Sequence, residues 1–116
     1  MKSPAASTEI LNSDPILAEI VRSLVAEFRP YKIFLFGSRA SGNARNDSDY
    51  DILVVMPELT EGSRKLAVRA YRILKGLGVA KDILFTSREK FELRKTVVNT
   101  LAEIATNDGK EIYVAA

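Results

Sequence analysis

The chain has 116 residues, 28% of them charged, and a formal net charge of +2 at pH 7. This length suits one hydrophobic core but not two, and so small a positive excess does not by itself indicate nucleic-acid binding. The sequence contains no cysteine and no histidine, which excludes disulfides, thiolate nucleophiles, histidine-ligated metals and Ser-His-Asp hydrolysis. Any catalysis must therefore rest on carboxylates, hydroxyls, Lys, Arg and an oxygen-preferring cation, Mg²⁺ or alternatively Mn²⁺.

The sequence was searched for a membrane segment and for an N-terminal signal-peptide pattern. There is no apolar run of about 18 residues and no signal-peptide pattern, so we expect a soluble, cytoplasmic protein without a membrane segment. Residues 1–13 are small and polar and are predicted to form a flexible tail. Residues 14–116 are predicted to form one domain, without internal repeats or a linker.

The first half of this domain predicts a helix and a strand. Asp14 can cap a helix, and Pro15 suits its first position because proline needs no amide partner there. Apolar residues then recur at helical spacing up to residue 28, where Arg29-Pro30 should end the helix. The continuous apolar run at residues 33–36 predicts a short strand buried on both sides.

The second half continues the alternation of helices and strands. Such an alternation predicts an α/β domain in which helices pack against a small sheet. The expected elements, in order, are a turn with a brief helix at residues 37–42, a strand at 50–56, a helix capped by Ser63, a strand at 79–85, a helical region with Thr86 and Glu89 as a capping box, and a short edge strand at 112–114.

Two aspartates at the start of the second strand are the first candidate site residues. The side chains of Asp49 and Asp51 should point to the same face of the sheet, whereas Tyr50 between them points away. Asp is disfavoured in strands, so two on one face need a reason, and metal binding is one. The alternative is a solvated turn, because residues 46–49 are rich in turn formers. For an isolated Asp-x-Asp this alternative is favoured.

Two further features strengthen the metal interpretation. Gly37 follows a buried strand and lets the backbone approach a ligand closely, and Ser38 adds a hydroxyl donor to a turn that can hold a phosphate. Asp82 opens the third strand and can bring a third carboxylate beside Asp51. Taken singly, these residues are better explained by a helix cap and by a surface ion pair with Lys81. Together they indicate a cation site beside a phosphate-binding turn, since gathered carboxylates repel one another without a cation.

The basic residues are less informative. Arg39 and Arg45 flank the predicted pocket and can hold a triphosphate. The basic residues of segments 64–75 and 88–95 are better explained as solvated helix faces.

These residues resemble the polymerase-β-like nucleotidyltransferase superfamily. The resemblance rests on the Gly-Ser turn within residues 37–42, on Asp49-x-Asp51 before an apolar strand, and on the distal Asp82. The small size and the C-terminal segment 101–113 are similar more specifically to the minimal nucleotidyltransferases, or MNT proteins. The resemblance covers about residues 15–114. It implies an α/β fold with a small mixed β-sheet flanked by helices.

The resemblance also implies roles for the site. Asp49, Asp51 and Asp82 would be the catalytic and metal-binding residues, with Mg²⁺ as the expected ion and Mn²⁺ as the alternative. Gly37 and Ser38 would bind the phosphates of an NTP, with ATP favoured, and Arg39 and Arg45 would assist. One departure stands out, because Ser41 replaces an arginine that many members carry. We expect this change to weaken phosphate binding.

MNT proteins are often paired with an all-helical HEPN protein, which they neutralise as antitoxins, in some cases by transferring AMP to a tyrosine of the toxin. The resemblance therefore implies a HEPN-type partner that presents the acceptor hydroxyl, since the chain has no room for an acceptor domain. The alternative is an antitoxin module that binds nucleotide or partner without turnover. A nucleic-acid-binding domain is disfavoured because no aromatic or Arg-rich stripe is present. The identity of the nucleotide and the formation of a homo-oligomer are left open.

Overall fold

The computed structural model describes residues 4–45 and 48–116, with only the backbone described for residues 4–8. Four strands form one sheet in the order β3-β2-β1-β4. Strand β1 pairs antiparallel with β2 and with β4, whereas β2 and β3 are parallel. The predicted mixed sheet is therefore confirmed. Its strands are β1 (Lys32–Phe36), β2 (Tyr50–Met56), β3 (Lys81–Ser87) and β4 (Lys110–Val114).

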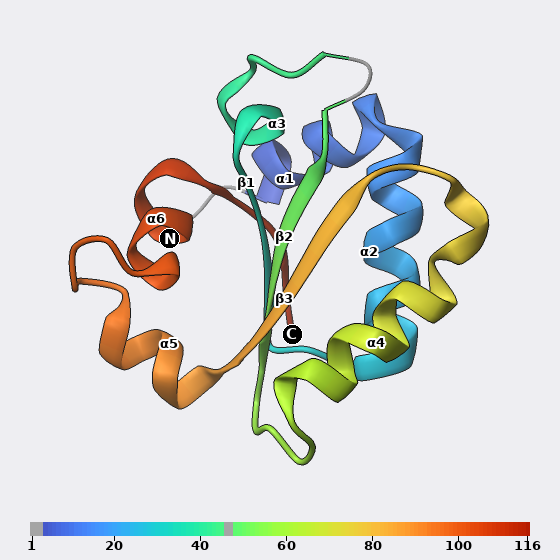
Figure 1. Cartoon of the computed structure of the whole chain (residues 1–116). Helices are drawn as coiled ribbons and strands as arrows, with labels where there is room; N and C mark the ends of the chain where they lie inside the picture. The colour runs from blue at the N-terminus through green and yellow to red at the C-terminus, as the bar shows by residue number, and fades with distance from the viewer. Residues whose placement is uncertain (1–3, 46–47) are drawn as a thin grey trace.

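Helices cover both faces of this sheet, with α2 and α4 on one side and α5 and α6 on the other (Figure 1). No helix in the described part of the chain is long and apolar enough to cross a membrane. The helical elements are α1 (Pro4–Ser13), α2 (Pro15–Phe28), α3 (Ser38–Ser41), α4 (Ser63–Ile73), the 3₁₀ turn η1 (Lys75–Leu77), α5 (Arg88–Arg94) and α6 (Leu101–Asp108).

The alternation of side chains along β2 builds a separate apolar core on each face. Ile52 and Val54 belong to the larger core, which α2 and α4 complete. Leu53 belongs to the smaller core, in which Phe34 of β1 stacks on Phe91 of α5 with ring centroids 5.1 Å apart. Because the strand period is two, Asp49 and Asp51 lie on the same face as Leu53. The acids therefore share their face of the sheet with α5 and α6.

Helix α2 begins and ends as its sequence predicts. Asp14 caps it by accepting a hydrogen bond of 3.1 Å from the amide of Leu17, and Pro15 takes the first helical position. Arg29 ends the helix in a left-handed conformation with φ of 49°. The buried residues lie along one side of the helix, at the spacing seen in the sequence.

The N-terminal segment differs from its prediction. A loose tail was expected over residues 1–13, of which residues 1–3 lie outside the described part. Residues 4–13 form the helix α1, and Ile10 and Leu11 pack against the larger core. These two apolar side chains provide the physical reason, because burying them stabilises a helix whose remaining residues are mostly small and polar.

Two predicted helix caps are wrong. Ser63 is the first residue of α4 rather than its cap, and Gly62 takes the cap position without a side-chain hydrogen bond. Strand β3 runs two residues further than expected, so that Ser87, not Thr86, caps α5 and accepts a bond from the amide of Lys90. The helical region predicted after it is divided into α5 and α6, with Asn99 in the connection at a φ of 70°.

The basic face of α4 is solvated except at one residue. Arg69 is half-buried and forms ion pairs with Glu27 of α2, at 3.1 Å, and with Glu61, at 2.6 Å. Its guanidinium also lies 4.8 Å from the centre of the Phe28 ring. The other basic residues of this segment are exposed, namely Arg64, Lys65, Arg72 and Lys75.

Candidate active site

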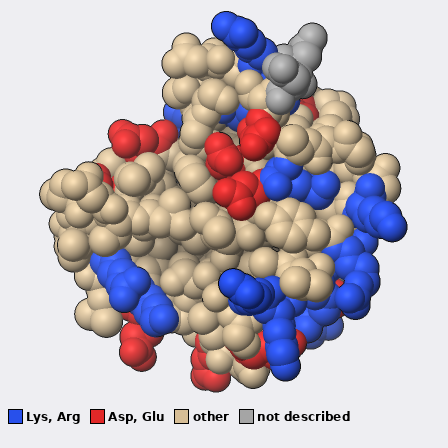
Figure 2. All heavy atoms as spheres, viewed as in Figure 1, with Lys and Arg blue, Asp and Glu red and all other residues tan. Residues whose placement is uncertain are grey.

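Strands β2 and β3 bring the three predicted acids to one end of the sheet. Asp51 and Asp82 are each the second residue of their strand and are register partners in the parallel pair. Asp49 precedes Asp51 by two residues and is exposed. The turn formers at positions 46 and 47, which supported the alternative reading, lie outside the described residues. A group of acidic atoms is visible near the middle of the molecular face in Figure 2.

Mutual repulsion acts on Asp51. Partial burial raises the pKa of its carboxyl group, and the charges of Asp49 and then Asp82 raise it further. Each of the three causes disfavours the ionised form. The carboxylates consequently lie where a divalent cation would relieve an unfavourable concentration of charge, and their oxygens are the ligands that Mg²⁺ and Mn²⁺ prefer.

The turn after β1 lies directly against this carboxylate. Gly37 has a φ of 75°, and a Cβ atom at this position would lie 2.2 Å from Oδ2 of Asp51. No other residue fits there without displacing the acid. The predicted proximity of the Gly-Ser turn to the acid pair is therefore present in the structure, as a contact with Asp51.

Helix α3 makes the turn compact. The amides of Ala40 and Ser41 both donate to the carbonyl of Gly37, at 3.1 and 3.2 Å, and the amide of Asn43 donates to the carbonyl of Ser38. The amides of Ala40 and Ser41 are thus engaged within the turn. Ser38 itself is half-buried at the start of α3, next to the Gly37 contact.

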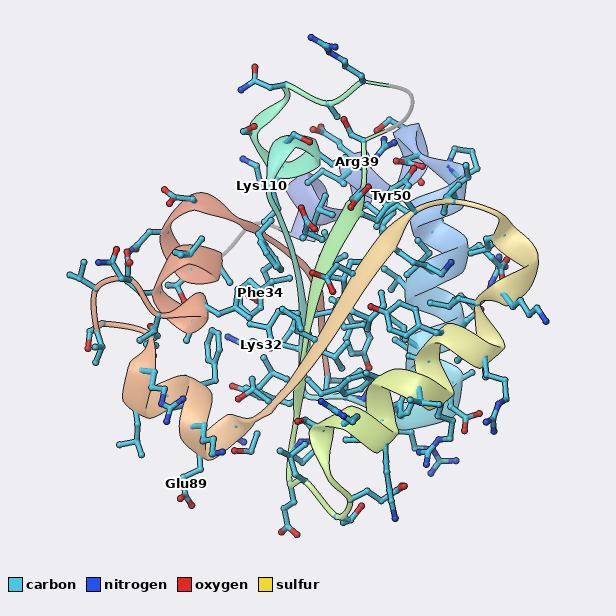
Figure 3. The ribbon with its side chains drawn as sticks, in the orientation of Figure 1. Lys32, Phe34, Arg39, Tyr50, Glu89 and Lys110 are labelled. Carbon is cyan, nitrogen blue, oxygen red and sulfur yellow. The ribbon has the colours of Figure 1, made fainter. Side chains whose placement is uncertain are left out.

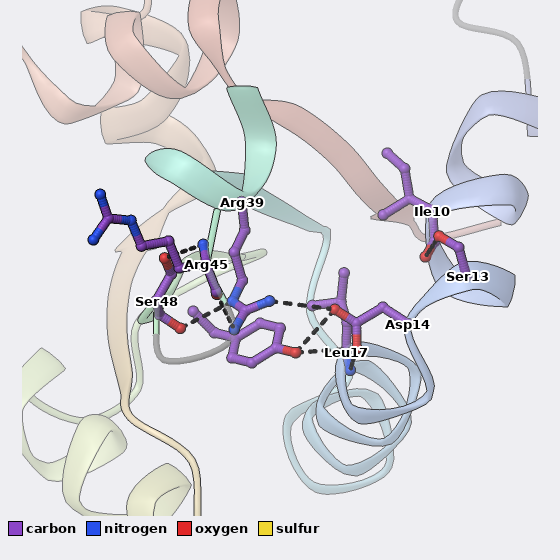
Figure 4. Close-up of polar contacts among 8 residues, drawn as sticks. Ile10, Ser13, Asp14, Leu17, Arg39, Arg45 and Ser48 are labelled. Carbon is purple, nitrogen blue, oxygen red and sulfur yellow. Dashed lines mark hydrogen bonds and ion pairs between the residues drawn. The ribbon is translucent and has the colours of Figure 1, made fainter. Parts of the chain in front are cut away.

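Arg39 holds the loop that follows. Its Nε donates to the carbonyl of Ser48 at 3.0 Å, and its guanidinium lies 3.9 Å from the ring centre of Tyr50. The guanidinium also lies 4.0 Å from a carboxylate oxygen of Asp14. Arg39 and Tyr50 occur together at the α3 end of the sheet in Figure 3, and Figure 4 marks the contacts of Arg39 with Ser48 and Asp14. The structure thus assigns Arg39 a structural role that the sequence did not reveal.

Arg45 has a different environment. It is exposed, and its backbone amide donates to Oγ of Ser48 at 2.7 Å. Its side chain extends away from Arg39 and Asp14 (Figure 4). The role of Arg39 and Arg45 as phosphate ligands stays a prediction.

Tyr50 points away from the acids, as its position between them implied. Its hydroxyl donates to Asp14, 2.9 Å from Oδ2, and so connects β2 to the cap of α2. Burial, followed by the bond to Asp14, raises the pKa of Tyr50 to about 12.

Sequence reasoning missed a second tyrosine at the site. The hydroxyl of Tyr71 in α4 accepts a hydrogen bond of 2.9 Å from the amide of Ile83 and donates one of 3.3 Å to Oδ1 of Asp82. Nothing in the sequence marks this contact, because the two partners are 11 residues apart and meet only when α4 packs beside β3. Among the described residues, no three acidic side chains stand close enough together to enclose one metal ion, and the role of Asp82 as a metal ligand stays a prediction.

A hollow of about 230 Å³ lies between the sheet and helices α5 and α6. Two of its lining residues lie on the face of the sheet that carries the acids, since Leu53 follows Asp51 by two residues and Thr86 follows Asp82 by four. At about 3.3 Å per residue these steps span roughly 7 and 13 Å. The other lining residues include Lys90, Arg94, Thr100 and Leu101. The hollow is thus lined by two basic side chains, Lys90 and Arg94, together with apolar and hydroxyl-bearing residues.

At one end of its sheet this α/β domain thus combines a Gly-Ser turn, which contacts Asp51, with two further aspartates, Asp49 and Asp82. The Nucleotidyltransferase domain family matches residues 16–108, and the chain belongs to this family. Its polymerase-β-like fold, expected from the sequence, is thereby confirmed.

Two solved structures share this fold. One is a toxin–antitoxin structure with AMP-PNP, with a TM-score of 0.56 and 20% identity over 84% of this chain and 73% of the other. The second is a candidate nucleotidyltransferase from Sulfolobus solfataricus, with a TM-score of 0.57 and 20% identity over 98% of this chain and 89% of the other. No curated protein sequence matches the chain at a significant level.

Proposed function

We propose that this protein is a metal-dependent nucleotidyltransferase that moves a nucleoside monophosphate from an NTP to a hydroxyl group of a partner. The observation that carries the proposal is the contact between Gly37 and the carboxylate of Asp51, beside Asp82 on the next strand. It supports a site in which the phosphates of a nucleotide rest on the turn while the α-phosphate lies near the acids. Membership of the family supports the class of reaction.

Each residue of the site has its own role in the proposed reaction. Asp49 and Asp51 would hold a divalent cation, Mg²⁺ in the first place, which when bound supplies charge stabilisation to the phosphates and the leaving group. Gly37 and Ser38 would hold the terminal phosphates. Asp82 would accept the proton of the attacking hydroxyl. This assignment needs no histidine, in agreement with the composition.

The partner we propose is an all-helical HEPN-type toxin in the cytoplasm, with this chain as its antitoxin and ATP as the donor. The shared fold with a toxin–antitoxin structure that was determined with AMP-PNP supports a toxin as partner and an adenine nucleotide as donor, whereas the HEPN type rests on the family resemblance.

A second candidate function is an antitoxin that binds nucleotide or partner without turnover. The position of Arg39 favours it, because its guanidinium is already engaged by the loop and by Tyr50. With Ser41 where many relatives have arginine, fewer cations remain to bind a triphosphate.

A transfer assay separates the two functions. The protein is incubated with Mg²⁺ and α-labelled ATP, CTP, GTP or UTP, with lysate or the product of the neighbouring gene as acceptor. We expect label on an acceptor band with the wild type and none with the double variant Asp49→Ala, Asp51→Ala. The control is Asp108→Ala, which removes an exposed acid at the end of α6. Binding of Mg²⁺–nucleotide without transfer would support the non-catalytic function instead.

A further inference from the structure

The hydroxyl of Tyr71 stands where an acceptor hydroxyl is needed. It donates to Oδ1 of Asp82 at 3.3 Å, and Asp82 is the acid that our proposal assigns to receive the acceptor's proton. The hydroxyl oxygen of Tyr71 in turn accepts a hydrogen bond of 2.9 Å from the amide of Ile83. A phenol oxygen has two lone pairs, so the bond from Ile83 leaves one lone pair for attack. The hydroxyl of Tyr71 is therefore held by two hydrogen bonds, one that it accepts and one in which it directs its proton to Asp82.

Tyr71 is distinct from the other tyrosines in this respect. All four lie in the described part of the chain, and Tyr50 directs its hydroxyl to Asp14 on the far face. Tyr31 lies under the guanidinium of Arg88, 4.2 Å from its ring centre, and Tyr113 belongs to the opposite edge strand β4. Of the four, Tyr71 alone has a hydrogen bond to one of the three site acids.

The contact is open to a ligand. Tyr71 and Asp82 are both exposed, and both line a groove of about 280 Å³ between α4 and β3. The groove lies at the outer edge of the sheet, since β3 is its terminal strand. Asp82 is in turn the register partner of Asp51, which contacts the phosphate-binding turn. The order across the sheet is thus turn, metal-binding acids, proton acceptor and tyrosine hydroxyl.

We propose that Tyr71 is a site of self-modification, at which the protein attaches a nucleoside monophosphate to its own tyrosine hydroxyl. The inference rests on the proposed function. The oxygen of Tyr71 attacks the α-phosphorus of the bound NTP, and its proton passes to the carboxylate of Asp82. The bond from the α-phosphorus to the bridging oxygen of the β-phosphate breaks, and pyrophosphate leaves with that electron pair. The products are an O-nucleotidyl tyrosine and pyrophosphate, and no other reactant is required.

Intact-protein mass spectrometry after incubation with Mg²⁺ and each of the four NTPs tests the proposal. We expect one adduct with the mass of a nucleoside monophosphate less water, mapped by peptide sequencing to Tyr71. The rate of labelling should not change on dilution, because the hydroxyl and the acid belong to the same chain. Tyr71→Phe should lose the adduct, whereas the matched variant Tyr113→Phe should keep it.

Folding and nucleotide binding are monitored in parallel. Tyr71 is 37% exposed, and its replacement by Phe removes one hydroxyl, so Tyr71→Phe should keep the wild-type thermal shift with Mg²⁺–nucleotide. An adduct on another residue, or an undiminished adduct in Tyr71→Phe, would overturn the assignment. Pyrophosphate release and transfer to an external acceptor without any self-labelling would overturn it too, while leaving the proposed function intact. No pyrophosphate release with any NTP or acceptor would overturn both.

Discussion

At the scale of single residues, Gly37 and Asp51 share a space that leaves no room for a Cβ atom. The φ of Gly37 is 75° with a ψ of −158°, a backbone conformation that is essentially restricted to glycine. A methyl group there would also lie 2.2 Å from a carboxylate oxygen of Asp51. Backbone strain and steric clash therefore act at the same position, next to the proposed phosphate site.

We expect Gly37→Ala to lower the free energy of unfolding by about 1–3 kcal/mol, the usual cost of a residue forced into such a conformation. It should also abolish the thermal shift caused by Mg²⁺–nucleotide, because Asp51 must move. Urea denaturation and thermal scans with and without ligand measure both effects. The control is Gly62→Ala, since a Cβ there meets nothing within 4 Å and its φ is −60°. Equal effects of the two substitutions would contradict this account.

The raised pKa of Asp51 gives a second prediction. Because the folded-state pKa lies above the ordinary value of 3.8, the folded protein binds more protons than the unfolded chain between the two pKa values. Stability must fall as pH rises through this window, and the ionised carboxylate costs stability at neutral pH. Asp51→Asn should therefore raise the melting temperature by a few degrees at pH 7 in a buffer without divalent ions.

The gain from Asp51→Asn should vanish below the unfolded-state pKa, where the wild-type carboxyl group is protonated in both states. It should also come with loss of stabilisation by Mg²⁺–nucleotide, since the neutral amide is a weaker ligand. Melting curves over a pH series record both effects, with Asp108→Asn as the control. A lower melting temperature for Asp51→Asn at neutral pH would count against the electrostatic cause.

At the scale of elements, one arginine connects four parts of the fold. Arg39 of α3 reaches the loop at Ser48, the ring of Tyr50 in β2 and the cap of α2 at Asp14. Its charge and its planar shape suit all three contacts. The loop between α3 and β2 is therefore held by a side chain of α3, beside the proposed nucleotide site.

We expect Arg39→Ala to lower the free energy of unfolding by about 1–2 kcal/mol, from the lost cation–π contact and hydrogen bond. Hydrogen exchange should accelerate at the amides of the loop. Arg45→Ala should leave stability nearly unchanged, because that side chain is exposed. Chemical denaturation and exchange mass spectrometry of the two variants provide the comparison. If the two variants have the same stability, Arg39 does not hold the loop.

The elements also show what the sequence could predict. Helix α2 was predictable because its cap, first proline and apolar spacing are local signals, and β2 because its apolar run is continuous. The proximity of Asp51 and Asp82 followed from the strand period and from neighbouring strands. Helix α1, the end of β3 and the cap of α5 were not predictable, because packing against distant residues decides them.

The same distinction holds within the site. The acids and the Gly-Ser turn were found because each belongs to a short motif. The roles of Arg39 and Tyr71 were not, since their partners are 9 and 11 residues away along the chain. The sequence around an arginine near a turn does not indicate which hydrogen-bond acceptor its side chain will contact. Only the packed structure assigns Arg39 to the loop and Tyr71 to Asp82.

At the scale of the whole molecule, the two faces of the sheet have unequal cores. The face under α2 and α4 buries a large cluster that includes Ile20 and Leu24, each 0% exposed. The face under α5 and α6 buries a much smaller cluster around Phe34 and Phe91. Local stability follows the amount of buried apolar contact. The helices over the smaller cluster, α5 and α6, also line the hollow between them and the sheet.

We therefore predict that α5 and α6 open before the rest of the domain. Native-state hydrogen exchange should show their amides exchanging about tenfold faster or more than those of α2, whose protection should follow the global free energy of unfolding. Phe91→Leu should accelerate amide exchange in α5 and α6. The exchange rates of the α2 amides should change only by the amount that the lower global free energy of unfolding accounts for. Bound Mg²⁺–nucleotide should slow exchange in this layer if the ligand extends from the acids into the hollow. Uniform protection across both layers would instead mean that the two cores unfold as one unit.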